Sequence, residues 1–238
     1  MPLFELLPGW LDRFAIPRTG LIVVGAHEGQ ELPHYTRAGF ARQLWIEPQP
    51  APFARLTAAL PPSPDIRAFN LACGPDNGTA TMFTLQNNQG LSNSLLPPNL
   101  HLREYPDMPP GEPFQVPVVR LDDLLTRERL DPAAFSFLVM DVQGYELHVL
   151  RGAPALLASG ASSPASGLQA ILTEVSTAEL YKGCALLPDM DAHLAAAGFT
   201  RVITRLNRHH YGDALYVRAE HLSPAQRLRL RLLGPGRR

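Results

Sequence analysis

The sequence predicts a doubly wound α/β fold, in which a mostly parallel sheet carries helices on both faces and ends in an antiparallel hairpin. Apolar, β-branched runs such as Leu21-Ile22-Val23-Val24 are typical of strands that are buried on both faces. These runs alternate with helical stretches, which is the pattern of right-handed crossovers between parallel strands. Near the end of the sequence two strands follow each other directly, joined by the loop 207–213, and they predict the hairpin.

Each element has a local signal. The first strand ends at Gly25, and Pro52 opens the second helix, which another proline follows. The turn at 76–78 precedes an added strand, and Asp122 is a favoured N-cap that predicts a helix over 122–129. The predicted strands are 21–24, 43–46, 66–71, 80–85, 116–120, 135–140, 169–175, 200–206 and 214–218. The predicted helices are 30–38, 52–60, 122–129, 145–158 and 188–197.

The composition fits one large domain. A chain of 238 residues, 45% hydrophobic and 18% charged, is long enough to bury the core of an α/β domain without splitting. We expect a single domain over 1–238, with its folded core at about 20–218. The formal net charge of -1, with both signs interleaved, gives no reason to expect binding to nucleic acid or to an anionic membrane. A small-molecule or carbohydrate-like substrate fits this balance better.

No segment of the sequence predicts export or membrane insertion. Residues 1–12 lack the basic, apolar and small-residue regions of a signal peptide, and no apolar run reaches spanning length. Cys73 and Cys184 lie far apart, without a CxxC partner or a histidine ligand pattern, which argues against a disulfide framework or a zinc site. We therefore expect a cytoplasmic protein.

Two segments lie outside the alternation of strands and helices. Residues 95–117 are rich in proline and poor in periodicity, so they are either a lid or substrate loop, or an insertion without a role. In residues 223–238, three arginines alternate with leucines before a Gly-Pro-Gly-Arg-Arg end. We interpret this second segment as a short surface helix with a basic tail, rather than as a partner-binding element.

The candidate site follows from the fold class, because such sheets bind ligands at the carboxyl ends of their strands. Gly25 and Gly29 lie in the turn after the first strand, where a ligand can approach the backbone amides. Glu47 follows the second strand about 20 residues on, where a carboxylate can accept both ribose hydroxyls of an adenosine cofactor. Alone, the glycines are equally the pattern of a tight turn. The missing third glycine argues against a pyrophosphate, and adenosylmethionine has none.

Three further carboxylates are candidates at the strand ends. Asp141 follows a buried strand, where it is a base, a metal ligand or a helix cap. Glu146 lies one turn later and either supports Asp141 or faces solvent as a helix-start charge. Glu174 lies within an apolar strand and needs a partner or a cavity. Asp141 and Glu174 suit a hard cation, but no ligand cluster in the sequence requires one, so we predict no metal.

Other polar residues near these loops are weaker candidates. His27 lies inside the glycine turn, and His209 and His210 lie in the hairpin loop. Each of these histidines suits a general base near neutral pH, although loop histidines are more often surface residues. The run Ser92-Asn93-Ser94 suits contacts to a cofactor or to sugar hydroxyls, or a simple turn.

Taken together, these pieces resemble the FkbM family of methyltransferases over about residues 20–218. The matching stretches are 24–31, 45–48, 72–78, 92–94, 121–124, 141–146, 149–153 and 173–175. The resemblance implies a Rossmann-like, seven-stranded methyltransferase fold, S-adenosylmethionine as donor, and O-methylation of a hydroxyl on a sugar, glycan or natural-product intermediate. The cofactor contacts that it implies fall on Gly25, Ala26, His27, Gly29, Glu47, Pro48, Ala72, Ser92 and Asp141. Asp141 is the first candidate for the base, followed by His27 and Glu174.

Two positions depart from the family pattern. The family usually has Asp before Val-Gly-Ala in the first motif and Asn after it, whereas this chain has Val23 and His27. Both positions touch the cofactor loop, so a catalytically silent protein that binds an adenosyl ligand is the first alternative. A nucleotide-dependent oxidoreductase on the same fold is the second.

Overall fold

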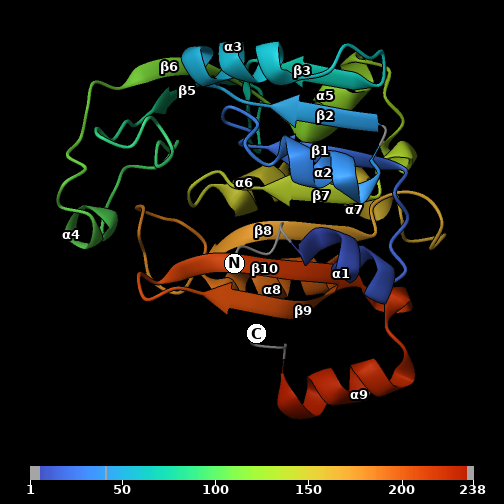
Figure 1. Ribbon diagram of the computed structural model, residues 1–238. Helices are drawn as coiled ribbons and strands as arrows, with labels where there is room; N and C mark the ends of the chain where they lie inside the picture. The colour runs from blue at the N-terminus through green and yellow to red at the C-terminus, as the bar shows by residue number, and fades with distance from the viewer. Residues whose placement is uncertain (1–5, 41, 235–238) are drawn as a thin grey trace.

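The computed structural model, which describes residues 6–40 and 42–234, has a seven-stranded sheet in the order β3-β2-β1-β7-β8-β10-β9 (Figure 1). Its strands are β1 (Gly20–Val24), β2 (Arg42–Ile46), β3 (Ile66–Phe69), β7 (Phe137–Met140), β8 (Ala170–Ser176), β9 (Phe199–Leu206) and β10 (Tyr211–Arg218). The first five are parallel, while β10 runs antiparallel to both β8 and β9. The predicted α/β class and its terminal hairpin are therefore confirmed.

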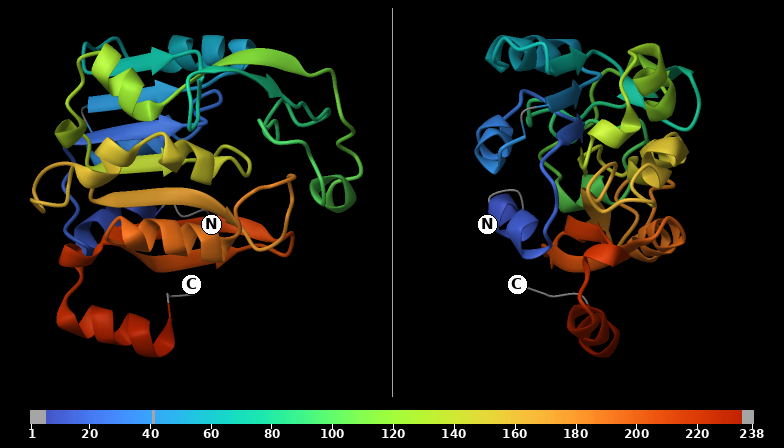
Figure 2. Two further views of the ribbon diagram at one scale, coloured as in Figure 1. Left: turned by 180° about the vertical axis from the view of Figure 1, so that it is seen from behind. Right: turned by 90° about the vertical axis from the view of Figure 1, so that its right-hand side faces the viewer.

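Helices cover both faces of this sheet (Figure 2, right). One face packs against α1 (Leu7–Arg13), α2 (Leu32–Ala38) and α3 (Pro50–Ala59). The other packs against α5 (Leu121–Arg127), α6 (Glu146–Arg151), α7 (Pro154–Ala158) and α8 (Leu187–Ala196). All five residues of β1 are buried, with Leu21 and Val23 in the first core and Ile22 and Val24 in the second. Each such side chain contributes about 1.5–3 kcal/mol when it is fully buried, which is why the strand has no polar position.

A smaller sheet extends beyond the carboxyl ends of the main strands. It pairs β4 (Ala72–Cys73), β6 (Phe114–Val119) and β5 (Gly78–Met82) in the order β4-β6-β5. The chain between β5 and β6 carries α4 (His101–Glu104) and reaches out past the main sheet (Figure 1, left). There Tyr105 Oη lies 3.0 Å from Tyr211 Oη, and Glu104 Oε2 lies 2.8 Å from His209 Nδ1. These contacts tie the excursion to the hairpin.

The prediction of one helix over 145–158 was wrong, because the chain breaks into α6 and α7 at Gly152-Ala153-Pro154. Pro154 has no N–H for an intrahelical bond but suits the first turn of a new helix. The predicted cap was also wrong, since α5 begins at Leu121 without a side-chain cap. Asp122 instead accepts hydrogen bonds from Ala155 N at 2.7 Å and Leu156 N at 3.0 Å. It therefore caps the start of α7, a contact that sequence proximity does not reveal.

Smaller differences concern segment bounds. The predicted strand 66–71 ends already at Phe69 as β3, and β4, in the smaller sheet, begins at Ala72, just after the predicted end. The end of the proline-rich segment belongs to β6, which begins at Phe114. Helix α1 and the 3-10 turns η2 (Pro132–Ala134) and η3 (Ala219–His221) were not predicted, whereas α9 (Pro224–Leu233) confirms the expected surface helix. Within residues 6–40 and 42–234, none of the helices has the length and apolar character needed to cross a membrane.

Candidate active site

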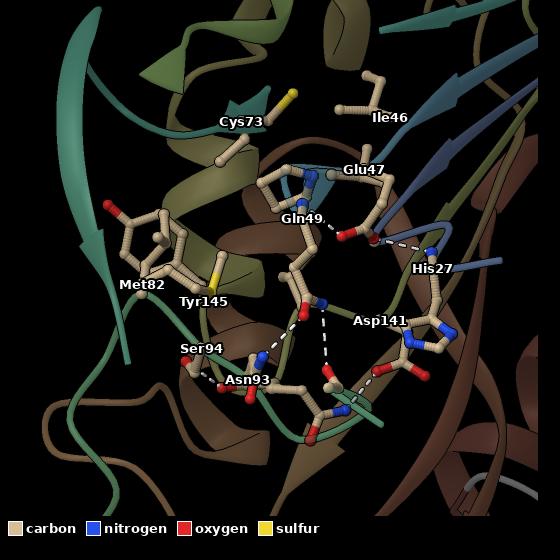
Figure 3. A pocket seen from close by; sticks show the side chains of 18 of the residues that line it. His27, Ile46, Glu47, Gln49, Cys73, Met82, Asn93, Ser94, Asp141 and Tyr145 are labelled. Carbon is tan, nitrogen blue, oxygen red and sulfur yellow. Dashed lines mark hydrogen bonds between the residues drawn. The ribbon is translucent and has the colours of Figure 1, made fainter. Parts of the chain in front are cut away.

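A cavity lies at the carboxyl ends of β1, β2 and β7 (Figure 3). The register of the sheet sets Val24 beside Ile46 and Met140, so the loops after these three residues emerge at one edge. The remaining walls come from β4, β5 and the segment 90–95.

Glu47 is the buried charge at one end of the cavity, directly after β2, and only 2% of its surface is exposed. Its Oε2 accepts a hydrogen bond from His27 N at 2.8 Å, and its Oε1 accepts one from Gln49 N at 2.8 Å. Burial raises the pKa of Glu47, while these backbone donors oppose the rise. Each carboxylate oxygen keeps a further lone pair, so the side chain retains the capacity to accept hydroxyl donors from the cavity.

The glycine turn after β1 is shaped by crowding between strand ends. Gly25 has a φ of +82°, and a Cβ there would lie 1.9 Å from the carbonyl oxygen of Asp141. A Cβ on Gly29 would lie 2.8 Å from Leu56 Cδ1 in α3. Packing therefore requires glycine at position 25, whereas at position 29 it is the φ of +78° that favours glycine, because the end of the Leu56 side chain can shift. The turn still matters for the site, because it aims the backbone N–H of His27 at Glu47.

His27 bridges the glycine turn and the excursion. It adopts a φ of +45°, a region in which Asn, Asp and His are enriched. Its ring Nδ1 lies 2.7 Å from Gln30 Nε2, which acts as the donor, so Nε2 carries the ring hydrogen and donates it to the Gln89 carbonyl at 3.0 Å. Both ring nitrogens are engaged in this way. His27 therefore has a structural role in the turn, and it is poorly placed to act as a base.

Asp141 stands at the end of β7, and its side chain opens into the cavity. It does not cap α6, because the residue before that helix is Tyr145. Asp141 reaches solvent through the cavity, but the surrounding protein excludes enough water to raise its pKa to about 6. A hydrogen bond from Gln143 acts in the opposite direction and lowers this pKa. The distance from Gln143 Nε2 to Asp141 Oδ1 is 2.6 Å. A carboxylate that titrates near neutral pH is suited to proton transfer.

Gln143 joins Asp141 to two other groups. Its Nε2 also donates to Glu174 Oε2 at 3.2 Å, and its Oε1 accepts from Tyr181 Oη at 3.2 Å. The one hydrogen of the Tyr181 hydroxyl also has the Ser92 carbonyl as an acceptor, at the shorter distance of 2.9 Å, so it is the two acids, as acceptors, that orient the amide nitrogen of Gln143. Burial, and then the charge of Asp141, raise the pKa of Glu174 well above its ordinary value.

Glu146 stabilises the loop between β7 and α6 through hydrogen bonds to its backbone. Its side chain is buried, and its Oε1 accepts from Val142 N at 3.1 Å and Gly144 N at 3.2 Å. Burial raises its pKa to about 7. Glu146 therefore holds the backbone that carries Asp141 and Gln143 and does not touch the Asp141 carboxylate through a hydrogen bond of its own.

The segment before the proline-rich excursion closes the cavity. Asn93 Nδ2 donates to Gln49 Oε1 at 2.7 Å, and Gln49 Nε2 donates to the Gly90 carbonyl at 3.1 Å. Ser94 Oγ donates to the Gln143 carbonyl at 2.8 Å. Within the predicted lid, 95–117, Leu95 alone lines the cavity. The wall is thus formed mainly by residues that come just before that segment.

The other end of the cavity is apolar. Ile46, Leu71, Cys73, Met82 and Tyr145 line it, between Glu47 and the small sheet (Figure 3). Burial raises the pKa of the Cys73 thiol to about 12, so this cysteine is a packing residue rather than a nucleophile. Such a slot suits a flat, weakly polar ring.

The structure brings most of the predicted residues together. Gly25, His27, Glu47, Pro48, Ala72 and Asp141 line the cavity. Ala26, Gly29, Ser92 and Glu174 do not, and neither do His209 and His210. Ser92 instead offers its carbonyl to Tyr181 Oη at 2.9 Å. Sequence reasoning missed Gln49, Met82 and the role of Gln143. Gln143 lies within the stretch 141–146 that resembles the family, but nothing in that stretch distinguishes it as a site residue. Among residues 6–40 and 42–234, no group of three His, Cys, Asp or Glu side chains is arranged to hold a metal ion.

The fold defines the class of protein. The structure of magnesium protoporphyrin IX methyltransferase from Synechocystis PCC 6803, solved with bound SAM, is similar over 91% of this chain and 78% of that chain, with a TM-score of 0.50 and 10% identity. At that identity the likeness shows the fold alone, which is the Rossmann-like methyltransferase fold.

Sequence comparison then gives the family. The model of the methyltransferase FkbM domain matches residues 24–201. The chain is also 29% identical, over 174 residues, to the 2-O-methyltransferase NoeI of Sinorhizobium fredii, an alignment that covers 70% of this chain and 67% of that protein. The chain therefore belongs to the FkbM methyltransferase family, as its sequence predicted, and S-adenosylmethionine is its methyl donor.

Proposed function

We propose that this protein transfers a methyl group from S-adenosylmethionine to a hydroxyl oxygen of a sugar, glycan or natural-product intermediate. The observation that carries the proposal is Asp141, a carboxylate whose pKa is raised to about 6 and which opens into the cavity. The name of the relative, a 2-O-methyltransferase, supports oxygen as the acceptor atom. A cytoplasmic location and a single domain over 1–238 remain predictions of the sequence.

The residues of the cavity fit the cofactor. Glu47 is a buried carboxylate with unused lone pairs, which suits the ribose hydroxyls, and the apolar slot around Ile46, Cys73 and Met82 suits the adenine ring. The polar side of the cavity, with His27 and Asp141, suits the amino-acid part. When bound, S-adenosylmethionine supplies an electrophilic methyl group on a sulfonium. Ala26, Gly29 and Ser92, which the family resemblance also implied, do not line the cavity.

The protein contributes position and a proton acceptor. Asp141 takes the proton of the acceptor hydroxyl on a carboxylate oxygen, while Gln143 Nε2 donates to that carboxylate at 2.6 Å and to Glu174 at 3.2 Å. A base of this kind contributes about 10²–10⁴-fold to the rate. Alignment of the two reactants contributes roughly 7–11 kcal/mol in favourable cases, so the closed walls matter as much as the base.

The test combines binding and turnover. Calorimetry should show that adenosylhomocysteine binds and that NADH does not displace it. Transfer of labelled methyl to a panel of sugar and polyol acceptors should then identify an accepting hydroxyl. In Asp141→Asn, kcat should fall by about 10²–10⁴-fold, and the loss of adenosylhomocysteine affinity from the amino-acid side of the cavity should be much smaller than this fall. The surface control Asp65→Asn should match wild type. Tight binding without turnover on any hydroxyl acceptor would overturn the proposal, and so would NADH binding that excludes adenosylhomocysteine.

A further inference from the structure

Helix α9 lies at the edge of the molecule and packs against its core through Leu230. Figures 1 and 2 show it as the outermost element at one end, beyond β9. Ser223 Oγ accepts from Gln226 N at 3.2 Å, and Gln226 Oε1 accepts from Ser223 N at 2.7 Å, which makes a capping box. Because this box satisfies donors at the start of the helix, α9 is specified by its own sequence and not only by packing.

The outward face of α9 is apolar. Leu228 is 58% exposed and Leu232 is 73% exposed, and these two residues lie one turn apart on the same face. Leu230, on the opposite side of the helix, packs against the core below. The described part of the chain exposes only two other large hydrophobic side chains, Leu91 and Leu206. Leu228 and Leu232 are therefore a concentrated apolar surface that the fold itself does not use.

This apolar face occurs in the most basic part of the sequence. Residues 223–238 contain five arginines and no acidic residue, whereas the whole chain has a formal net charge of -1. The remainder of the chain is therefore net acidic. Within α9, Arg227 and Arg229 are exposed on either side of Leu228 in sequence. Although the net charge of the whole protein is small, positive charge is concentrated in residues 223–238, of which 235–238 lie outside the described residues.

We propose that α9 binds the surface of a bilayer that contains anionic phospholipid. Leucines between arginines suit the boundary of headgroups and acyl chains, where the apolar face enters and the guanidinium groups pair with phosphates. The acidic remainder of the chain is repelled by the same surface, so the protein orients with α9 toward the lipid. A nucleic acid would leave Leu228 and Leu232 in water. A second copy would set arginines against arginines. The proposal is independent of the proposed methyl acceptor.

The experiment uses the whole chain and vesicles of phosphatidylcholine, either alone or mixed in equal parts with phosphatidylglycerol. Sedimentation should carry the protein down with the mixed vesicles and leave it in solution with phosphatidylcholine alone. The double variant Leu228→Ser/Leu232→Ser should lose this binding, and Arg229→Gln should weaken it about fivefold. Leu206→Ser, which removes an exposed leucine elsewhere, should bind like wild type. Circular dichroism should show that all variants are folded.

Several results would overturn the proposal. One is equal binding to vesicles with and without phosphatidylglycerol, and another is unchanged binding by the double leucine variant. Light scattering that detects a dimer in wild type and a monomer in Leu228→Ser/Leu232→Ser would assign the face to a second copy instead. Tighter binding to duplex DNA than to the mixed vesicles, lost in Arg229→Gln, would assign it to nucleic acid.

Discussion

Replacing Glu47 by Gln removes the charge that we assign to the ribose hydroxyls while it keeps the shape of the side chain. The two carboxylate oxygens accept from His27 N and Gln49 N, each at 2.8 Å. In the variant, one of these backbone N–H groups meets an NH2 group, and the unsatisfied donor costs about 1–3 kcal/mol of stability. Loss of one charge-assisted bond to a ribose hydroxyl costs about 1.5–3 kcal/mol, which corresponds to adenosylhomocysteine binding that is roughly 10- to 150-fold weaker.

Calorimetry with adenosylhomocysteine measures the affinity, and urea unfolding measures the stability. The matched control is Glu28→Gln, because Glu28 is a carboxylate in the same turn that pairs at the surface with Arg55, 2.6 Å away, and does not line the cavity. A 2′,3′-dideoxy analogue of the ligand completes the cycle. It should bind wild type much more weakly than the parent ligand does, whereas Glu47→Gln should barely distinguish the two. A variant that binds adenosylhomocysteine as tightly as wild type does would refute the assignment of Glu47.

Three further predictions concern the support of the site. Gln143→Met removes a hydrogen bond that lowers the pKa of Asp141, so the acidic limb of the pH–rate profile should move above about pH 6. The control Gln115→Met, which changes an exposed amide, should leave the profile unchanged. Because burial raises the folded-state pKa of Glu146 to about 7, its contribution to stability is complete below its ordinary pKa and is lost as pH rises through 7. Urea unfolding should therefore show wild type losing about 3 kcal/mol more than Glu146→Gln between pH 4 and pH 8, and equal losses would contradict this. Asp122→Ala uncaps α7 and should cost about 1–2 kcal/mol, more than Asp123→Ala does in the same assay.

The fold was largely predictable because burial on both faces leaves a plain record in the sequence. A strand such as β1, in which Ile22 and Val24 enter one core and Leu21 and Val23 the other, has no polar position to mask it. The rule that ligands bind at strand ends then located Glu47 and Asp141 correctly at one cavity. These inferences need only local sequence patterns and the fact that parallel strands have their carboxyl ends at the same edge of the sheet.

The remaining features depend on contacts between distant segments. Asp122 caps α7, more than thirty residues away, because the two helices pack together, and no local pattern carries that information. Gln143 acts through Glu174 and Tyr181, which come from later parts of the chain. The break before Pro154 could have been predicted from the sequence, since proline seldom continues a helix. The apolar run around it concealed the break.

Position 27 shows how a departure from a family pattern is resolved by geometry. A residue with φ of +45° is needed there, and His27 accepts that conformation while its ring spans from Gln30 to the Gln89 carbonyl. Val23, the other departure, is buried in the core on the side of α1 to α3 and does not line the cavity. Of the two departures, only His27 contributes to the cavity walls.

The most direct test of the central claim is a crystal structure of the protein with adenosylhomocysteine. We predict that the ribose hydroxyls lie within hydrogen-bonding distance of the Glu47 carboxylate, that the adenine lies in the slot beside Cys73 and Met82, and that the sulfur faces Asp141. A nucleoside bound outside this cavity, or bound within it with its ribose away from Glu47, would contradict the account.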